Sequence, residues 1–140
     1  MSNNTNYNLT KKERDCIILI EKGSTGEFPI RVLDLAKSMK VKPPTVEELL
    51  YRLEEKKMII RKKGMIMLTK LGKKTYTDII LCHRVLETFF VDCGVSVSEA
   101  CEKISNFDYM IDTDTAKMIL VKLGNPTKCP HGHNIIENIE

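Results

Sequence analysis

The sequence predicts a mainly α-helical protein with one small β-hairpin. Apolar residues recur at helical spacings along most of the chain, as they do where each helix buries one face. Residues 58–68 break this pattern, because two short β-type runs flank Lys62-Lys63-Gly64. A change of charge near residue 77 then separates an N-terminal half that holds the hairpin from an all-helical C-terminal half.

Three helices are expected before the hairpin. The first covers residues 9–22, where Thr10 and Glu13 form a T-x-x-E capping box, and the second covers residues 30–39. The third covers residues 45–57 and follows two prolines, which suit a turn or a first helical turn but not a helix interior. Its inward-facing residues are Val46, Leu49, Leu50 and Leu53.

The hairpin follows these helices directly. Its strands are expected at residues 58–61 and 65–68, with a basic turn between them. A supporting helix, a helix-turn-helix and a hairpin in this order are the layout of a winged helix-turn-helix, and helical bundles rarely carry such a hairpin. We therefore predict an N-terminal winged helix-turn-helix domain over residues 1–75.

A long helix over residues 70–92 begins the second half. Thr69 is placed to cap its start, and Gly94 is placed to end it. At about 1.5 Å per residue it would span roughly 35 Å, enough to join two small lobes.

The C-terminal part, residues 76–140, is predicted to be a small all-helical dimerisation domain. Shorter helices at residues 96–105 and 113–123 follow the long one, and the tail after them has no helical period. Such a domain is too small to bury a full hydrophobic core by itself. Its large share of apolar residues therefore suggests that it packs against a second copy.

Length and composition limit the classes of protein to which the chain can belong. A chain of 140 residues with 42% hydrophobic and 29% charged residues is typical of one globular domain or two small ones. No apolar run approaches the roughly 18 residues of a membrane span, and no N-terminal segment resembles a signal peptide. The five cysteines have no disulfide-scaffold spacing. We expect a cytoplasmic protein with reduced thiols and no membrane partner.

The net charge of +3 conceals a difference between the two halves. Residues 1–77 carry 17 Lys and Arg against 9 Asp and Glu, whereas residues 78–140 carry 5 against 10. So basic an N-terminal half suggests a polyanionic partner, most simply nucleic acid. A lysine-rich solvated surface is the alternative.

Catalysis is the function class that the sequence excludes. It has no Gly-rich phosphate loop, no G-x-S-x-G elbow and no H-E-x-x-H motif. Cys82 and His83 are adjacent, but neighbours on a helix point about 100° apart and do not form a nucleophile–base pair. We therefore predict that the protein is not an enzyme.

The order of motifs resembles one known family. The stretch LAKSMKVKPPTVEELLYRLEEKKMI leads to the hairpin and LTKLGKK, and HRVLETFF, SEAC and LGNPTKCPHG follow. From about residue 9 to 136 this order resembles the diphtheria-toxin-repressor and manganese-transport-regulator family of metal-dependent transcriptional repressors. H-R-x-x-E-x-F and L-G-x-P-x-x-x-P-H-G are its most specific parts. The resemblance implies a homodimer that binds double-stranded operator DNA, with Fe²⁺ or Mn²⁺ fixing the spacing of its two winged heads.

DNA-binding residues are expected at the start of the third helix and at the hairpin turn. They are Lys42, Pro44, Thr45, Glu48, Lys62 and Lys63. Lysines suit phosphate contacts, and a Glu can accept from cytosine N4. Thr45 either caps the helix or contacts a base or phosphate. Glu47 and Glu48 repel phosphate, so they face either solvent or the groove of a limited set of sequences.

The resemblance also implies metal ligands. His83 and Glu87, one helical turn apart, match the family's H-R-x-x-E ligands, and Cys101 in S-E-A-C matches the thiolate of its other site. Imidazole and carboxylate suit Fe²⁺ or Mn²⁺, with Zn²⁺ as an alternative. Less favoured ligands are Glu99, Glu102, Cys129 and His131.

This chain departs from the family at that other site. Ile104 and Ser105 stand where the family has Glu and His. The family's N-terminal ligand falls near Lys11 or Lys12, neither of which is a metal ligand, and Asp15 would need a shift of register.

Three alternatives therefore stay open. In the first, His83, Glu87 and Cys101 form a rearranged site with Glu99, Glu102 or Asp15. In the second, the protein is a thiol- or zinc-responsive regulator, whose softer ion is held by Cys82, Cys101, Cys129, His131 and His133. In the third, it binds DNA without metal, and His83 is satisfied by Glu87 alone. Cys129-Pro130-His131-Gly132-His133 has close ligand spacing, but the family's P-H-G is largely structural.

Overall fold

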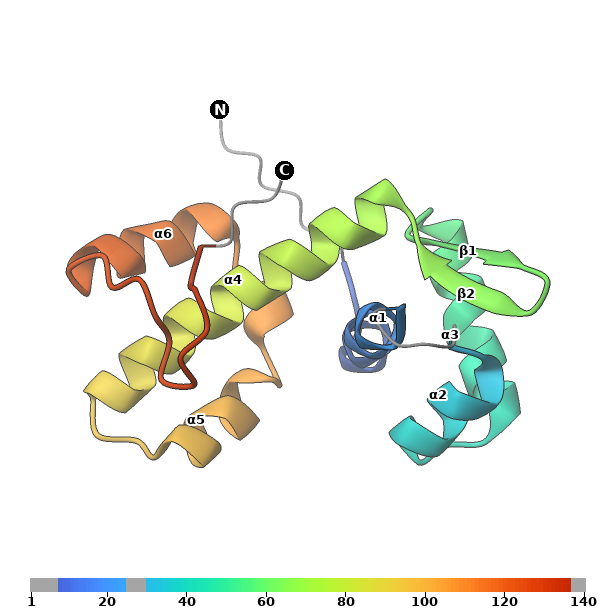
Figure 1. Ribbon diagram of the computed structural model, residues 1–140, viewed down its shortest axis with the longest axis horizontal. Coiled ribbons are helices and arrows are strands. Elements are labelled where there is room, and N and C mark those ends of the chain that lie inside the picture. The colour runs from blue at the N-terminus through green and yellow to red at the C-terminus, as the bar shows by residue number, and fades with distance from the viewer. Residues whose placement is uncertain (1–7, 25–29, 137–140) are drawn as a thin grey trace. The chain divides into compact units, whose positions relative to one another are not determined.

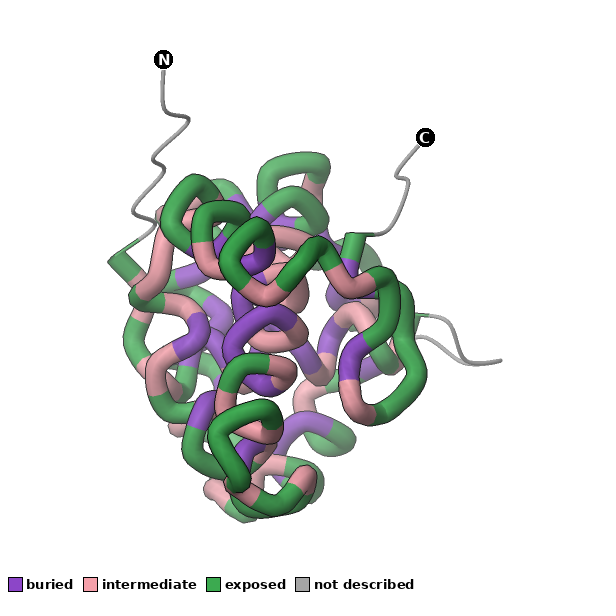
Figure 2. The backbone as a smooth tube through the Cα atoms, turned by 90° about the vertical axis from the view of Figure 1, so that its left-hand side faces the viewer, coloured by how far each residue is buried: buried purple, intermediate pink, exposed green. Residues whose placement is uncertain are grey.

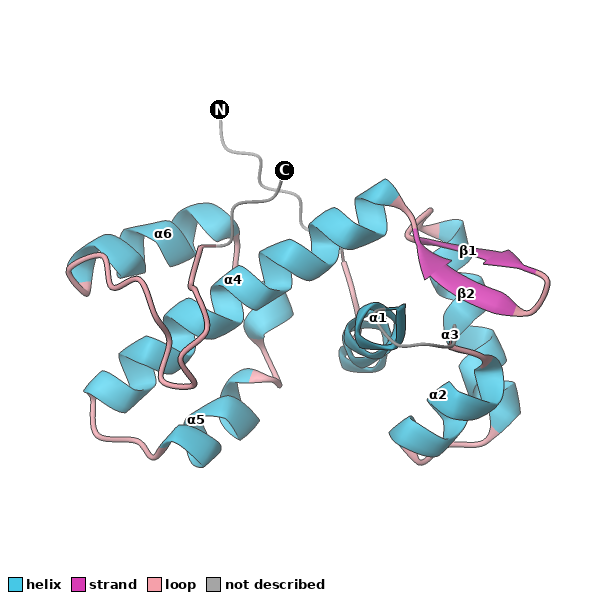
Figure 3. Cartoon of the chain, viewed as in Figure 1, coloured by secondary structure: helices cyan, strands magenta, loops and turns pink. Residues whose placement is uncertain are grey.

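The computed structural model describes residues 8–24 and 30–136 of the chain (Figure 1). The fold is mainly helical with one two-stranded antiparallel hairpin, as predicted (Figure 3). Contacts divide it into two compact units, one over Leu9–Tyr76 and the other over Thr77–Glu140 together with Met1–Asn8. Residues 1–7 and 137–140, and residues 25–29 between the first two helices, lie outside the described part of the chain.

The first unit holds three helices and the hairpin. Its elements are α1 (Lys11–Ser24), α2 (Val32–Met39), α3 (Pro43–Glu55), β1 (Ile59–Lys62) and β2 (Met65–Leu68). The Thr10 hydroxyl accepts the Glu13 N–H at 3.1 Å, which is the predicted N-terminal cap. Helix α3 begins two residues earlier than predicted, because the fixed φ and missing N–H of Pro43 suit the first helical turn.

Apolar side chains of α1, α3 and the hairpin form the interior of this unit. All four residues predicted to face inward from α3 are buried. They are joined by Ile17 and Ile20 of α1 and by Ile66 of β2. Burying one such side chain stabilises the fold by about 1.5–3 kcal/mol relative to leaving it exposed.

The hairpin turn is tighter than the sequence suggests. Lys62 pairs with Met65 in the strands, so only Lys63 and Gly64 form the turn, with φ of 52° and 78°. Positive φ at both central residues matches the right-handed twist of the flanking strands.

Helix α4 (Lys70–Asp92) has the predicted bounds. The Thr69 hydroxyl accepts the Gly72 N–H at 3.1 Å and donates to the Lys57 carbonyl at 2.7 Å, so the cap also ties the helix to the end of α3. The chain leaves the helix at Gly94, whose φ is +104°.

The second unit is built around the C-terminal part of α4. Helices α5 (Val97–Ile104) and α6 (Thr113–Lys122) and the short 3₁₀ helix η1 (Asp108–Met110) follow it, with side-chain caps at Ser96 and Asp112. Figure 1 shows α5, α6 and the irregular segment 125–136 around α4.

Two buried apolar clusters hold this unit together. One comprises Cys82, Val85, Ala116, Leu120, Cys129 and Ile135, and the other comprises Leu86, Ala100 and Ile104. In Figure 2 the buried stretches lie inside and the exposed ones on the outer turns. Among the described residues, no helix has the length and apolarity needed to span a membrane.

Candidate metal centre

His83 and Glu87 occupy one face of α4, one helical turn apart. The surrounding segments cover this face, so the Glu87 side chain is only 1% exposed and the His83 side chain only 12%. His83 Nε2 lies 3.1 Å from Glu87 Oε2. A carboxylate as buried as Glu87 needs compensating positive charge, from a protonated histidine or from a metal ion.

Asp108 of η1 orients the histidine from its other side. Its Oδ2 lies 2.9 Å from His83 Nδ1, and its side chain is fully buried. In the tautomer with its proton on Nδ1, towards this carboxylate, Nε2 offers its lone pair to a metal ion. A carboxylate behind a histidine in this way is the usual support of a metal-binding imidazole.

Cys101 of α5 brings a thiol to the same nitrogen. Its Sγ lies 3.5 Å from His83 Nε2, and one ligand atom from each of His83, Glu87 and Cys101 falls within 4.8 Å of the other two. Metal–ligand bonds of about 2.0–2.3 Å place the ligands of one ion up to about 4.5 Å apart. The three side chains thus have the spacing of a divalent metal site.

Glu87 also faces the C-terminal segment. Glu87 Oε1 lies 2.5 Å from His131 Nδ1, and Cys129 Sγ belongs to a second close group with these two side chains. Of the less favoured candidate ligands, Cys129 and His131 are therefore close to Glu87.

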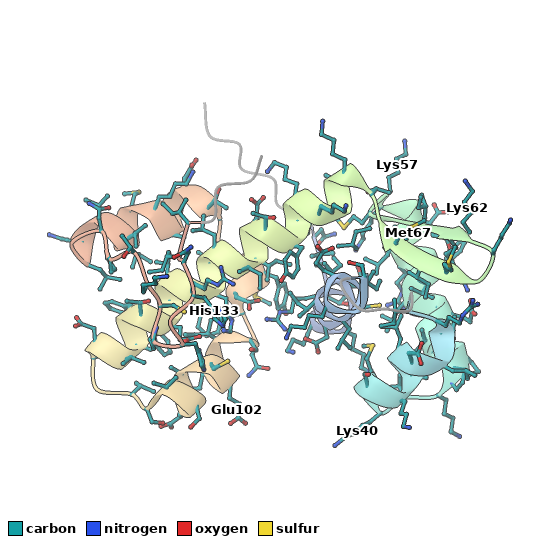
Figure 4. All side chains as sticks on the ribbon, viewed as in Figure 1. Lys40, Lys57, Lys62, Met67, Glu102 and His133 are labelled. Atoms are coloured by element: carbon teal, nitrogen blue, oxygen red, sulfur yellow. The ribbon has the colours of Figure 1, made fainter. Side chains whose placement is uncertain are left out.

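The other candidate ligands are not gathered at this cluster. Glu99 lies 3.7 Å from Lys103, and Glu102 is exposed and points away from α4 (Figure 4). Asp15 is paired with Lys11 at 2.5 Å and with Arg14 at 3.0 Å. Within the described residues, none of these three carboxylates joins a group with the spacing of a metal site.

Cys82 has a different environment from its neighbour His83. Its thiol donates to the Ile111 carbonyl at 3.3 Å within the apolar cluster. Burial, and to a smaller extent the charges of Asp78, Asp108 and Asp112, raise the pKa of the Cys82 thiol to about 12. Cys82 therefore stays a neutral thiol, which binds metal poorly.

The residues predicted to face DNA lie on the surface of the first unit. Lys42, Pro44, Glu48, Lys62 and Lys63 are exposed, and Thr45 is half-buried. Figure 4 shows Lys62 extending from the hairpin away from the helices. Thr45 does not cap α3, because the cap position belongs to Lys42 and Thr45 lies inside the first turn.

The two glutamates expected to repel phosphate are both paired. Glu47 accepts two hydrogen bonds from Arg61 of β1, at 2.8 and 3.0 Å, and these bonds lower the pKa of its carboxyl group. Glu48 accepts from Arg52 at 2.6 Å. Arg61 thus joins the hairpin to α3 and offsets the negative charge there.

Sequence reasoning missed the role of Asp108. This residue lies 25 positions from His83, between the helices predicted at residues 96–105 and 113–123. No local pattern marks it, and its role becomes visible only when η1 packs against α4.

Comparison with known proteins identifies the family. Residues 69–137, about half of the chain, match the family described as "Iron dependent repressor, metal binding and dimerisation domain". The chain belongs to the iron dependent repressor family. Members of this family are transcriptional regulators and not enzymes, in agreement with the prediction from the sequence. None of the curated proteins matches the chain.

Several solved structures share the fold of this family member. A hypothetical protein from Sulfolobus solfataricus superposes with a TM-score of 0.80 and 29% identity, over 92% of this chain and 100% of its own. ScaR with bound Zn²⁺ superposes with a TM-score of 0.77 and 27% identity, over 89% of this chain and 59% of its own. A manganese-dependent transcriptional repressor in complex with manganese superposes with a TM-score of 0.76 and 24% identity, over 90% of this chain and 59% of its own. The chain thus spans about three fifths of the last two.

Proposed function

We propose that the protein is a DNA-binding transcriptional repressor of metal homeostasis, whose affinity for operator DNA depends on a divalent transition metal. The observation that supports this most is the cluster of His83, Glu87 and Cys101, with Asp108 behind the histidine. Among the structurally similar proteins, ScaR is described as a manganese-activated repressor and also has a structure with bound Zn²⁺.

The bound metal would supply two positive charges and a bond between α4 and α5. His83 and Glu87 suit Fe²⁺ or Mn²⁺, whereas the Cys101 thiolate favours Fe²⁺ or Zn²⁺ over Mn²⁺. Without an ion, the cluster leaves the buried Glu87 carboxylate compensated only by imidazole. Metal binding is therefore expected to order this part of the second unit.

The DNA-binding part would be residues 1–75, acting as a winged helix-turn-helix. Its α3 would enter the major groove, and the exposed Lys62 and Lys63 at the hairpin turn would contact phosphates. Helix α4 leads from this hairpin into the metal cluster without a break, since it runs from Lys70 past Glu87. It is the element through which an ion could bias the DNA-binding heads.

We further propose a cytoplasmic homodimer formed by residues 76–140. Met118 and Val121 of α6 lie one helical turn apart. Their exposed fractions are 72% and 63%. Met110 beside α6 is 67% exposed. Large exposed apolar side chains this close together support a protein partner, and the family description names dimerisation.

The test is binding to the DNA upstream of its own gene, measured by fluorescence anisotropy with chelator and with Mn²⁺, Fe²⁺ or Zn²⁺. Metal is expected to raise the affinity about 10-fold or more, within the usual range of allosteric coupling. His83→Ala should abolish that increase, whereas the exposed His133→Ala should preserve it. Equal affinity of the wild type with metal and with chelator would contradict metal control.

Salt dependence tests the DNA surface separately. Replacing Lys62 and Lys63 by Ala should weaken binding to all sequences. It should also reduce the slope of log affinity against log salt by about 1 for each lysine that binds a phosphate in the wild type. Lys117→Ala, exposed on α6, is the matched control. An unchanged slope in the double variant would remove the hairpin from the proposed interface.

A zinc- or thiol-responsive regulator on the same fold is the second candidate function. It is favoured by the two thiols, Cys101 and Cys129, that lie close to Glu87. In that case Zn²⁺ or an oxidant would change DNA binding where Mn²⁺ and Fe²⁺ do not, and Cys101→Ser would abolish the response.

A further inference from the structure

Glu87 has a carboxylate oxygen that the His83 cluster does not use. This atom, Oε1, is buried and has no hydrogen-bond partner in the described part of the chain, although His131 Nδ1 lies 2.5 Å away. The contact lacks hydrogen-bond geometry, so the oxygen can still accept a further partner. A cation that bound both atoms would hold them about 3 Å or more apart, a separation that a small rotation of the His131 side chain provides.

Cys129 completes a second set of three ligand atoms. Its Sγ, a ring nitrogen of His131 and a carboxylate oxygen of Glu87 lie within 4.8 Å of one another. The set at His83 and Cys101 has the same composition of one sulfur, one imidazole nitrogen and one oxygen of Glu87. Glu87 is thus the shared member of two matching groups.

A tight turn presents Cys129 and His131 to α4. The Gly132 N–H donates to the Cys129 carbonyl at 2.8 Å, and Gly132 has a φ of +84°. Pro130 at the second position of the turn fixes its backbone in advance. The C-P-H-G sequence therefore sets the turn before any ion binds.

The turn is also attached to α4 by contacts that leave the ligand atoms free. Arg84, one turn before Glu87, donates to the Asn134 carbonyl at 2.7 Å. Ile135 is buried in the same apolar cluster as Val85. These contacts keep the segment beside Glu87, so little ordering is needed when a metal binds.

We propose that Cys129, His131 and Glu87 form a second metal site, and that the Glu87 carboxylate bridges it to the site at His83 and Cys101. A thiolate and an imidazole select a cation such as Zn²⁺, Co²⁺ or Fe²⁺ over Mg²⁺ or Ca²⁺. The inference rests on the proposed function only through the shared Glu87. Because one carboxylate serves both ions, binding at one site changes the affinity of the other.

Titration of the metal-free full chain with Co²⁺ tests this proposal. Absorption from thiolate-to-cobalt charge transfer reports each site that contains a cysteine. The wild type is expected to bind two Co²⁺ per chain, and His131→Ala and Cys129→Ser are each expected to bind one. His133→Ala is the matched control, because its ring lies 6.4 Å from that of His131 but belongs to neither group, and it should still bind two.

The outcomes separate this site from the proposed function. One Co²⁺ in the wild type, unchanged in both His131→Ala and Cys129→Ser, overturns the second site and leaves the first intact. Two Co²⁺ in both variants also overturns it. No Co²⁺ in the wild type overturns both proposals. Cys129 is buried, so if its variant does not fold, His131→Ala decides, because the His131 side chain is 43% exposed.

Discussion

The candidate metal centre gathers side chains from three separate elements. His83 is in contact with Glu87, Cys101 and Asp108, which come from α4, α5 and η1. Glu87 and Cys101 could be named as candidate ligands from the family's H-R-x-x-E and S-E-A-C motifs. Asp108 could not, since its position depends on how η1 packs.

Asp108→Asn tests the orientation of the histidine. The amide keeps the shape but removes the negative charge behind His83 Nδ1, so metal affinity should fall about 10–100-fold. Isothermal titration with Mn²⁺ or Zn²⁺ measures this, with circular dichroism to verify folding. Asp114→Asn, exposed on α6, should leave the affinity unchanged. Equal affinities in the two variants would contradict the role given to Asp108.

The buried thiols make a prediction about pH. The pKa of Cys82 is raised to about 12 from an ordinary 9.0, chiefly by burial, and that of Cys16 likewise. Unfolded chains lose these protons near pH 9 while the folded protein keeps them, so stability should fall as the pH rises from about 9 towards 12.

Labelling with iodoacetamide measures the state of these thiols directly. At about pH 8.5, within the range where ordinary thiols ionise, the exposed Cys93 should react quickly, and Cys16 and Cys82 only as fast as the protein unfolds. Rapid labelling of Cys82 in folded protein would show that it is accessible and ionisable.

The elements were largely predictable because their signals are local. Periodic apolar residues, the caps at Thr10, Thr69 and Ser96, and the turn glycine each act within a few residues, and α4 has the bounds that such signals predict. The start of α3 and the hairpin turn shifted by one or two residues. The pairing of Arg61 with Glu47 was not predictable, because it depends on the hairpin folding back on α3.

Gly72 in the first turns of α4 is needed for close packing. A Cβ atom there would lie 2.0 Å from the Met58 carbonyl oxygen, which belongs to the backbone and has little freedom to move. Gly72→Ala should therefore destabilise the protein by about 1–3 kcal/mol or more, despite the higher helix propensity of alanine. Urea unfolding followed by circular dichroism measures this, with the exposed Lys73→Ala as the control. A Gly72→Ala variant as stable as the wild type would contradict the packing described here.

For the whole molecule, the charge of each half indicates a class of partner, whereas no pattern in the sequence places the candidate ligands in space. The basic first half and acidic second half are evident from the sequence, and they support a DNA-binding part joined to a metal-binding part. The sequence alone leaves several ligand sets open. Ile104 and Ser105 stand where the family has two metal ligands, so the family pattern is incomplete in this chain. His131 reaches Glu87 only when the C-terminal segment folds beside α4.

The position of the bound ion shows whether His83, Glu87 and Cys101 form a metal centre. Crystals of the full chain grown with Mn²⁺ or Zn²⁺ can be measured above and below the absorption edge of the metal. An anomalous peak within bonding distance of His83 Nε2, Glu87 and Cys101 is the predicted result. Peaks only elsewhere in metal-loaded crystals, or no peak at all, would contradict a metal centre at these residues.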